Sequence, residues 1–418
     1  MVAQQLARRA GWEASIVPPE PEKPGAIIKS LNDDSPLERA RLLPGDRIIQ
    51  VDGIKILGTE EWDHATYSIT SSNKTELHIK RESQYFIKKV QLKPLFKEVH
   101  NGLTTYYESV VNDYGIRQRT IITTPDPETK LPALFLVQGL SCSTIEKHFE
   151  RSNNWIKMIQ ALVEDSGMVV MRVDKPGVGD SEGDCGCTDF RTELNGYETA
   201  FQELKTKSYV DPERIVVYGA SIGSAIAPWL ANKYGLSGIV SDGTFFKTWF
   251  EHMLEIERRI RQMSGDDEAT IAEKMNDAYI PLYYGMLIQK KSYAEIIDEY
   301  PAIAQYNYHG PDHMYGRPMS YYQQLQEFDL TSAWEQVSVP VRILRGSNDW
   351  IMSEFDNHII MDVSDRAGHT DHALHIYPGL DHWNTIHETD DDSFNFKPGK
   401  WDENLPKLVI GWANEMIQ

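Results

Sequence analysis

From about residue 98 to the C-terminus, short continuous apolar runs alternate with stretches of helical periodicity. Such runs are typical of strands buried on both faces, and apolar residues three and four apart indicate amphipathic helices. The expected strands are 133–137, 168–173, 214–219, 237–241 and 339–344, and the expected helices are 155–165, 190–207 and 224–233. This pattern predicts an α/β fold with a mostly parallel sheet and helices on both faces.

One long insertion, from about 245 to 336, interrupts this alternation between two of the expected core strands. It has helical periodicity throughout, and we interpret it as a helical cap. It is also rich in tyrosine, for which packing is favoured over substrate contact. These tyrosines are Tyr279, Tyr283, Tyr284, Tyr306, Tyr308, Tyr315, Tyr321 and Tyr322.

The first part of the chain, residues 1–97, has a different pattern of short apolar runs and frequent turn signals. Ser35-Pro36-Leu37-Glu38 fits a capping box with proline at the first helical position. A strand is expected over 48–51, followed by Asp52-Gly53, which is typical of a hairpin turn. Further strands are expected at 76–80 and 86–92. We therefore predict a small β-rich domain over 1–97 and a larger domain over 98–418.

The small domain resembles a PDZ domain of the bacterial type. The match runs from Ser35-Pro36 through Gly45-Asp46 to Val51-Asp52-Gly53. PDZ domains bind extended peptides by adding a strand to a sheet edge, so the resemblance implies a peptide partner. The stretch 10–12, where the family has its carboxylate-binding loop, lacks the glycine–hydrophobic signature. The alternative is a module that packs on the larger domain or shapes its entrance.

The motif Gly219-Ala-Ser221-Ile-Gly223 lies directly between an expected strand and an expected helix. A sharp strand-to-helix turn needs small residues on both sides of a nucleophile, and it places the serine at a helix N-terminus. The alternative is a serine with only a structural role in a glycine-rich loop. The flanking elements favour Ser221 as a nucleophile.

With this context the stretch from about 100 to 418 resembles the α/β-hydrolase superfamily. In that family an acid and then a histidine follow the nucleophile, each after a late strand. Asp349 follows the strand at 339–344, and His382 follows Ile376-Tyr377-Pro378-Gly379. The resemblance therefore implies a Ser221–His382–Asp349 triad. Asp242 ends an earlier strand, where some lipases carry their acid, and is the alternative.

The same resemblance implies an oxyanion hole made by the backbone amides of Leu140 and Ile222. The family often has His-Gly in the upstream loop, and here Gln138 precedes Gly139, so a different anchor for this loop is expected. The segment 174–183 resembles the superfamily's Asp-x-x-Gly-x-Gly-x-Ser loop, which is normally structural and borders the site.

These expectations together indicate a serine hydrolase that cleaves an ester, thioester or amide through an acyl-enzyme, with esters and thioesters favoured over peptides. A first alternative is acyl transfer or cyclisation by the same triad, in which a substrate hydroxyl or amine replaces water. A second, of another class, is a non-catalytic PDZ–hydrolase scaffold or binding protein.

The formal charge of −20 argues against nucleic acid or an anionic membrane surface as a partner. No transmembrane segment or signal peptide is seen, so we expect a cytoplasmic protein. No cofactor or metal is expected, and we interpret His369, His372 and His375 as surface or strand histidines. Cys142, Cys185 and Cys187 fall on loops at the predicted catalytic edge. A link from Cys142 to either of the others fits this position, but a reducing compartment favours free thiols.

Overall fold

The computed structural model describes residues 6–20, 23–67, 69–146 and 153–418. The chain divides into two compact units. One consists of residues up to Glu98 together with Gly177–Glu182, and the other of Val99–Pro176 and Gly183–Gln418. In the described part of the chain, no helix combines the length and the apolar character needed to cross a bilayer.

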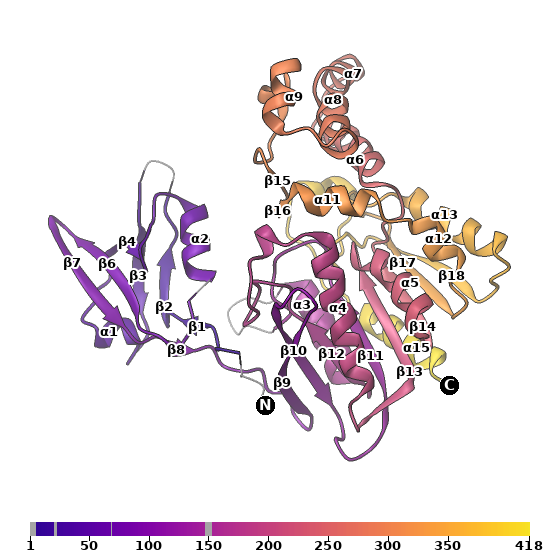
Figure 1. Ribbon diagram of the computed structural model, residues 1–418, viewed down its shortest axis with the longest axis horizontal. Helices are drawn as coiled ribbons and strands as arrows, with labels where there is room; N and C mark the ends of the chain where they lie inside the picture. The colour runs from indigo at the N-terminus through magenta and orange to yellow at the C-terminus, as the bar shows by residue number, and fades with distance from the viewer. Residues whose placement is uncertain (1–5, 21–22, 68, 147–152) are drawn as a thin grey trace. The chain divides into compact units, whose positions relative to one another are not determined.

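The N-terminal unit is built on a twisted antiparallel sheet with its own apolar core (Figure 1). The strand order is β2-β3-β4-β6-β7, and β5 pairs with β4. These strands span Ala14–Val17, Ala26–Leu31, Arg47–Val51, Thr75–Arg81 and Gln84–Val90, with β5 at Ile54–Lys55. Helices α1 and α2 span Pro36–Arg39 and Thr59–Tyr67, and β1 (Ala10–Gly11) pairs with β8 (Lys93–Pro94).

The turn signals in this unit are confirmed. The Ser35 hydroxyl accepts a hydrogen bond from the Glu38 amide at 3.1 Å and begins a one-turn helix. The box is not reciprocal, because the Glu38 carboxylate accepts from the Asp34 amide instead of the Ser35 amide. Asp52 and Gly53 have φ of 45° and 88°, the left-handed values that a tight hairpin requires.

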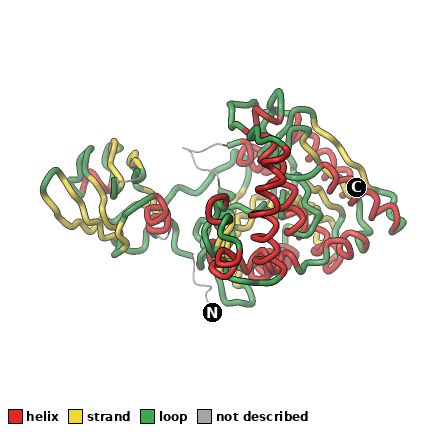
Figure 2. Tube along the Cα trace, turned by 90° about the horizontal axis from the view of Figure 1, so that it is seen from above, coloured by secondary structure: helices red, strands yellow, loops and turns green. Residues whose placement is uncertain are grey.

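The larger unit contains an eight-stranded sheet of order β18-β17-β14-β13-β11-β12-β10-β9 (Figures 1 and 2). The strands span Thr104–Val111 (β9), Arg117–Thr124 (β10), Leu131–Val137 (β11), Val169–Val173 (β12), Val210–Ala220 (β13), Gly238–Asp242 (β14), Val341–Gly346 (β17) and His372–Tyr377 (β18). Pairing is parallel from β12 to β18, whereas β9 and β10 are antiparallel additions. This is the mostly parallel α/β sheet that the pattern predicts, and it agrees with the fold that the resemblance to α/β hydrolases implies.

Helices cover both faces of the sheet because successive strand residues point to opposite sides. Phe135 and Val137 of β11 enter the core that includes α4 and α5, whereas Leu134 and Leu136 enter the core that includes α3 and α15. These helices span Asn154–Asp165 (α3), Phe190–Lys205 (α4), Gly223–Tyr234 (α5) and Asn404–Met416 (α15). Near the C-terminus, α13 and α14 span Glu354–Arg366 and Asp390–Phe394.

The insertion between β14 and β17 is helical, as predicted, and its orange helices project beyond the sheet in Figure 1. It contains α6 (Trp249–Met263), α7 (Glu268–Lys274), α8 (Ile280–Tyr283), α9 (Tyr293–Glu299), α10 (Ile303–Tyr306), α11 (Met319–Gln326) and α12 (Leu330–Glu335). Two π-helical turns, Met275–Tyr279 and Tyr284–Ile288, flank α8, and the short strands β15 (His313–Met314) and β16 (Arg317–Pro318) precede α11. Four of its tyrosines are fully buried, as packing residues should be: Tyr279, Tyr283, Tyr321 and Tyr322.

The preference for free thiols is wrong for two of the three cysteines. Cys142 and Cys185 form a disulfide with their Cα atoms 5.9 Å apart, and Cys187 is free and exposed. Free thiols were favoured because a reducing compartment was expected. The pairing depends on the approach of two loops that are 43 residues apart in the chain.

Candidate active site

Ser221 lies on a strained turn between β13 and α5. Its φ is 54°, a left-handed value that is uncommon for a residue with a side chain. A Cβ on Gly219 would come within 2.5 Å of the Gly223 carbonyl oxygen, and one on Gly223 within 2.2 Å of the Val137 carbonyl oxygen. The two glycines are therefore required by the close packing of this turn, which leaves the Ser221 side chain in a cavity.

The structure brings the three predicted triad residues together. The His382 Nε2 atom lies 3.1 Å from the Ser221 hydroxyl oxygen, and its Nδ1 atom lies 2.9 Å from a carboxylate oxygen of Asp349. The other Asp349 oxygen accepts hydrogen bonds from the Ile351 and Met352 amides at 2.9 and 3.0 Å. These amides hold the carboxylate in the direction that the imidazole needs.

The electrostatics of the pair favour an ion pair once His382 gains a proton. Burial by itself would lower the pKa of His382, but the carboxylate of Asp349, with smaller effects from Asp242 and Asp381, raises it above its usual value. Burial opposes ionisation of Asp349, yet His382 and Arg345 hold the pKa of Asp349 below its usual value. The Asp349 carboxylate thus stays charged beside the imidazole.

The loop that carries His382 is fixed by its own carboxylate. Asp381 accepts hydrogen bonds from the Trp383 and Thr385 amides at 2.9 and 2.8 Å and from the Ser393 hydroxyl at 3.0 Å. On the other side of the imidazole, a Cβ at Gly243 would lie 3.0 Å from the ring. The ring is therefore held between a braced loop and a backbone that comes close to it.

Asp242, the alternative acid, has a different partner in the structure. The Tyr218 hydroxyl donates to its carboxylate at 2.5 Å, and its backbone carbonyl accepts from the Ser221 amide at 2.8 Å. Burial raises the pKa of Asp242 to about 6, although the Tyr218 hydrogen bond and the charge of His382 act in the opposite direction. Asp242 is thus a second carboxylate near the imidazole, but Asp349 is the one hydrogen-bonded to it.

Leu140 and Ile222, whose amides are the predicted oxyanion donors, line the same cavity as Ser221. Among the described residues, neither amide donates a hydrogen bond. A Cβ on the neighbouring Gly139 would come within 2.9 Å of the Ser221 Cβ, so only glycine fits there. Neither N–H group is therefore used within the described residues, and both belong to residues that border the Ser221 cavity.

Lys175 provides the anchor for this loop. Its ammonium group donates to the Gly139 carbonyl oxygen and lies 3.3 Å from the carboxylate of Glu193. Lys175 is fully buried, and burial lowers its pKa to about 8 despite the opposing charge of Glu193. The sequence predicts that the loop has an unusual anchor, but it gives no sign that Lys175 is the residue.

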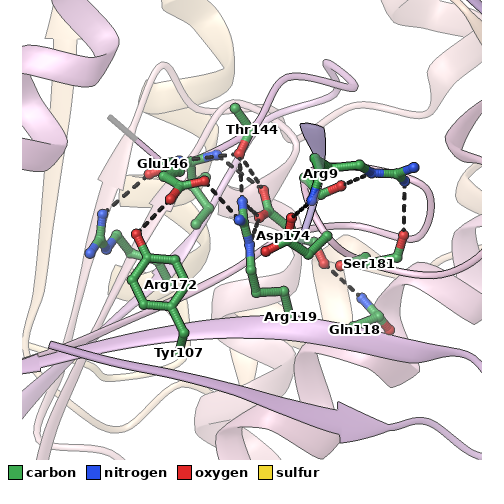
Figure 3. Close-up of polar contacts among 12 residues, drawn as sticks. Arg9, Tyr107, Gln118, Arg119, Thr144, Glu146, Arg172, Asp174 and Ser181 are labelled. Carbon is green, nitrogen blue, oxygen red and sulfur yellow. Dashed lines mark hydrogen bonds and ion pairs between the residues drawn. The ribbon is translucent and has the colours of Figure 1, made fainter. Parts of the chain in front are cut away.

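A buried polar network braces the continuation of the same loop (Figure 3). The Arg119 guanidinium donates to Asp174 at 2.6 Å, to Glu146 at 2.7 Å and to the Thr144 hydroxyl at 3.0 Å. The Thr144 hydroxyl in turn donates to Asp174 at 3.0 Å, and the Tyr107 hydroxyl donates to Glu146 at 2.5 Å. Asp174 therefore has the structural role that the Asp-x-x-Gly loop indicates.

The cavity above Ser221 has a volume of about 690 Å³ and is mainly apolar. Its aromatic wall consists of Trp155, Trp249, Trp350, Trp383, Phe394 and Phe396. The polar side chains that line it, besides serines and the triad histidine, are Asn153, His252, Arg261, Tyr308 and Tyr315. None of the described residues that line the cavity is an aspartate or a glutamate.

The sequence analysis did not single out three of these cavity residues, namely His252 and Arg261 of α6 and Trp350 of the loop after β17. His252 is buried beside the rings of Phe245 and Trp249, and burial lowers its pKa to about 3, so its imidazole is neutral. Arg261 lies further along the same helix, and Trp350 follows Asp349 directly. The only sequence feature that could have indicated the α6 residues is their spacing along the helix, and using it requires knowing where α6 begins.

The comparisons with known proteins agree with this architecture. Residues 148–390 match the model of a family described as serine aminopeptidase, S33, which covers more than half of the chain. The chain belongs to the S33 serine aminopeptidase family. These proteins are α/β hydrolases, and residues 17–91 match the model of a PDZ domain.

Individual relatives of this S33 protein are distant. The chain is 22% identical over 267 residues to the esterase EstD of Thermotoga maritima. The aligned region covers 62% of this chain and 56% of EstD. The chain thus matches only a little over half the length of that relative.

Among solved structures, the α/β hydrolase GrgF from Penicillium sp. sh18 covers 75% of this chain and 99% of its own, at 14% identity and a TM-score of 0.47. A thermostable carboxyl esterase from Bacillus coagulans covers 75% and 99%, at 17% identity and a TM-score of 0.45.

Proposed function

We propose that the protein is a serine hydrolase that cleaves carboxylic esters through an acyl-enzyme on Ser221. In this mechanism His382 takes the hydroxyl proton as Ser221 attacks the ester carbonyl, and Asp349 holds the imidazole tautomer and stabilises its cation. His382 then returns the proton to the leaving alcohol. Water, activated by the same imidazole, attacks the acyl-enzyme and releases the acid.

The tetrahedral intermediates need donors for their negative oxygen. The amides of Leu140 and Ile222 are the candidates, and each such donor is worth about 3 kcal/mol of transition-state stabilisation. The ammonium group of Lys175 acts indirectly. It donates a hydrogen bond to the Gly139 carbonyl and so fixes the orientation of the peptide group that carries the Leu140 amide. The hydrogen-bond geometry around His382 is the observation that carries this proposal.

The lining of the cavity favours esters over aminopeptidase substrates. An aminopeptidase must bind a free ammonium group close to the scissile bond, and a carboxylate is the side chain suited to that task. The described lining contains no carboxylate and includes the cation Arg261. A mainly apolar cavity with aromatic walls instead suits an ester of low polarity near its reactive carbonyl.

Steady-state hydrolysis of p-nitrophenyl esters, CoA thioesters and aminoacyl p-nitroanilides by the full chain tests the proposal. We expect ester turnover that Ser221→Ala removes and that Ser208→Ala, an exposed serine of the same unit, leaves intact. Preference for the anilides would move the assignment to a peptidase. Transfer of the acyl group to an added alcohol in place of water would support the acyltransferase alternative.

For the N-terminal unit we propose binding of an extended peptide at the edge of β2. β2 ends the sheet order and, among the described residues, pairs only with β3, so its outer edge has backbone groups that an added strand can use. Fluorescence anisotropy of a labelled library of C-terminal peptides, measured with the full chain, tests this. Absence of binding by every peptide would leave the unit without a peptide role.

A further inference from the structure

The cavity extends from the triad along one face of α6. The α6 residues that line it are Trp249, His252, Ile256, Ile260 and Arg261. The first four have the three- and four-residue spacing of one helix stripe, and Arg261 follows directly after the last of them, about 100° further round the helix. With a rise of about 1.5 Å per residue, the Cα atoms of Trp249 and Arg261 are about 18 Å apart along the helix axis. The cavity therefore accommodates an elongated group as well as the reacting carbonyl.

The character of the cavity changes along this stripe. Trp249 and His252 stand at the end of α6 that follows β14, near Ser221, and the charge of His382 affects the pKa of His252. Ile256 and Ile260 form an apolar middle section. Arg261 stands at the other end, so a ligand that fills the stripe meets apolar side chains first and a cation last.

Arg261 differs from the two other arginines in the last turns of α6. Arg258 is paired with Glu268 at 2.9 Å, and Arg259 binds Glu255 and donates to the Trp350 carbonyl at 2.7 Å. Among the described residues, Arg261 has no ion pair and no hydrogen bond, and its Nε atom is buried. Arginines 258 and 259 have structural partners, whereas Arg261 lines the cavity with a buried Nε atom that makes no hydrogen bond, and the nearby carboxylate of Glu257 interacts with it only through its charge.

Two tyrosines stand with Arg261 at this end. The Tyr308 hydroxyl donates to Glu257 at 2.7 Å, as the Tyr283 hydroxyl does at 2.6 Å. The Tyr315 hydroxyl lies 3.3 Å from that of Tyr308. Because Tyr308 uses its hydrogen on Glu257, the hydrogen between the two hydroxyls belongs to Tyr315, which donates it to Tyr308. Arg261 is therefore the donor that this end of the cavity offers to an anionic oxygen.

We propose that the substrate is an ester with an elongated apolar chain whose far end carries a carboxylate, bound by Arg261. This inference rests on the proposed ester hydrolysis and names its substrate class. The carboxylate pairs with the guanidinium at the end of the stripe, and the apolar chain lies along Ile256 and Ile260. Pairing at the far end fixes the distance between the carboxylate and the scissile carbonyl, so chain length becomes a specificity determinant.

Two matched series of esters test the proposal on the full chain. The first compares p-nitrophenyl monoesters of straight-chain dicarboxylic acids with p-nitrophenyl esters of monocarboxylic acids of equal length. The second compares acetate esters of ω-hydroxy acids with acetates of simple alkanols and shows whether the alcohol part occupies the stripe. We expect, in one series, at least about a tenfold higher kcat/KM for the carboxylate member at one optimal length.

Arg261→Gln should remove this preference, and an unchanged circular dichroism spectrum together with a thermal unfolding midpoint near that of the wild type shows that the variant is folded. Arg261→Lys should keep part of the preference. Arg258→Gln is the matched control, because it removes the same charge from the same helix without altering the cavity lining, and it should keep all of it. Glu257→Gln removes a nearby negative charge and should keep or increase the preference.

Neutral esters cleaved as well as carboxylate esters at every length in both series would overturn the proposal while leaving ester hydrolysis intact. A carboxylate preference that survives Arg261→Gln, or that disappears in Glu257→Gln with Arg261 present, would also overturn it. Absence of turnover of any ester by the wild-type protein would overturn this inference and the proposed function together.

Discussion

At the residue scale, the turn that carries Ser221 could be predicted because part of its constraint is local. Gly219 is required by its approach to the Gly223 carbonyl, four residues further on, whereas Gly223 is required by the Val137 carbonyl, which is distant in the chain. Asp349 and His382 could be named only through the order of strands in a recognised fold. Lys175 could not be predicted, because its partner, the Gly139 carbonyl, is distant in the chain and has no side chain to mark it.

Asp349→Asn should lower kcat for ester hydrolysis by about four orders of magnitude, because the amide favours the wrong imidazole tautomer. KM should change little, since Asp349 does not line the cavity. Steady-state kinetics with a p-nitrophenyl ester measure both constants. A loss of less than tenfold would show that another acid supports His382.

Asp242→Asn should have a much smaller effect on kcat and should shift the pH profile. The Asp242 charge helps to raise the pKa of His382, so removing it lowers that pKa. His382 must be neutral to accept the proton, and the acid limb of kcat/KM therefore moves to lower pH. The kcat/KM profile of the variant between about pH 4 and 9 measures this, in the range where such groups titrate. A limb that moves to higher pH would contradict the electrostatic role of Asp242.

At the element scale, the central parallel strands and the helices between them could be predicted because they are buried on both faces and read as apolar runs. β9 and β10 were not singled out, since their sequences, TTYYESVV and RQRTIITT, are largely polar. Polar residues fit β10 because Arg119 belongs to the buried network and β9 is the last strand of the sheet. The conformations of the loops at the sheet edge could not be predicted, because they depend on contacts between distant parts of the chain that hydrophobic periodicity does not encode.

Lys175→Met should lower kcat by about tenfold or more, because the loop that carries the Leu140 amide loses its anchor. KM for a small ester should remain near the wild-type value. Lys130→Met, which changes an exposed lysine of the same unit, is the control. Thermal unfolding of both variants distinguishes loss of the anchor from loss of the fold. An unchanged kcat in a folded Lys175→Met protein would contradict the role of Lys175 as the anchor of this loop.

The disulfide between the loops at 142 and 185 gives a second prediction at this scale. Alkylation without reduction should label Cys187 alone, and reduction should expose all three thiols. Closure of a loop of 43 residues stabilises the fold by about 4 kcal/mol in the chain-entropy model, so Cys142→Ser with Cys185→Ser should lower the unfolding temperature. Labelling of all three cysteines before reduction would contradict the pairing.

At the scale of the whole molecule, the chain contains two units with separate apolar cores. The core of the N-terminal unit is drawn from residues within the first 92, and the cores on the two faces of the large sheet are drawn entirely from the other unit. The first unit includes Gly177–Glu182 as well as the residues up to Glu98, and nothing in the sequence pattern indicates that this short segment groups with the N-terminal unit.

Calorimetry of the full chain should therefore show two unfolding transitions. A phosphonate attached to Ser221 lies within the larger unit, so it should raise the temperature of one transition and leave the other unchanged. The unmodified Ser221→Ala protein treated with the same reagent is the control. A single transition that moves as a whole on modification would contradict separate cores.

The central claim is that Ser221 is the nucleophile, and covalent labelling tests it most directly. Full-length protein is treated with a fluorophosphonate, and the peptide that contains residue 221 is analysed by mass spectrometry. We expect one phosphonyl group on Ser221, loss of ester hydrolysis in proportion to labelling, and no labelling of Ser221→Ala. Unmodified Ser221 in a protein that still cleaves esters, or undiminished ester cleavage by Ser221→Ala, would contradict it.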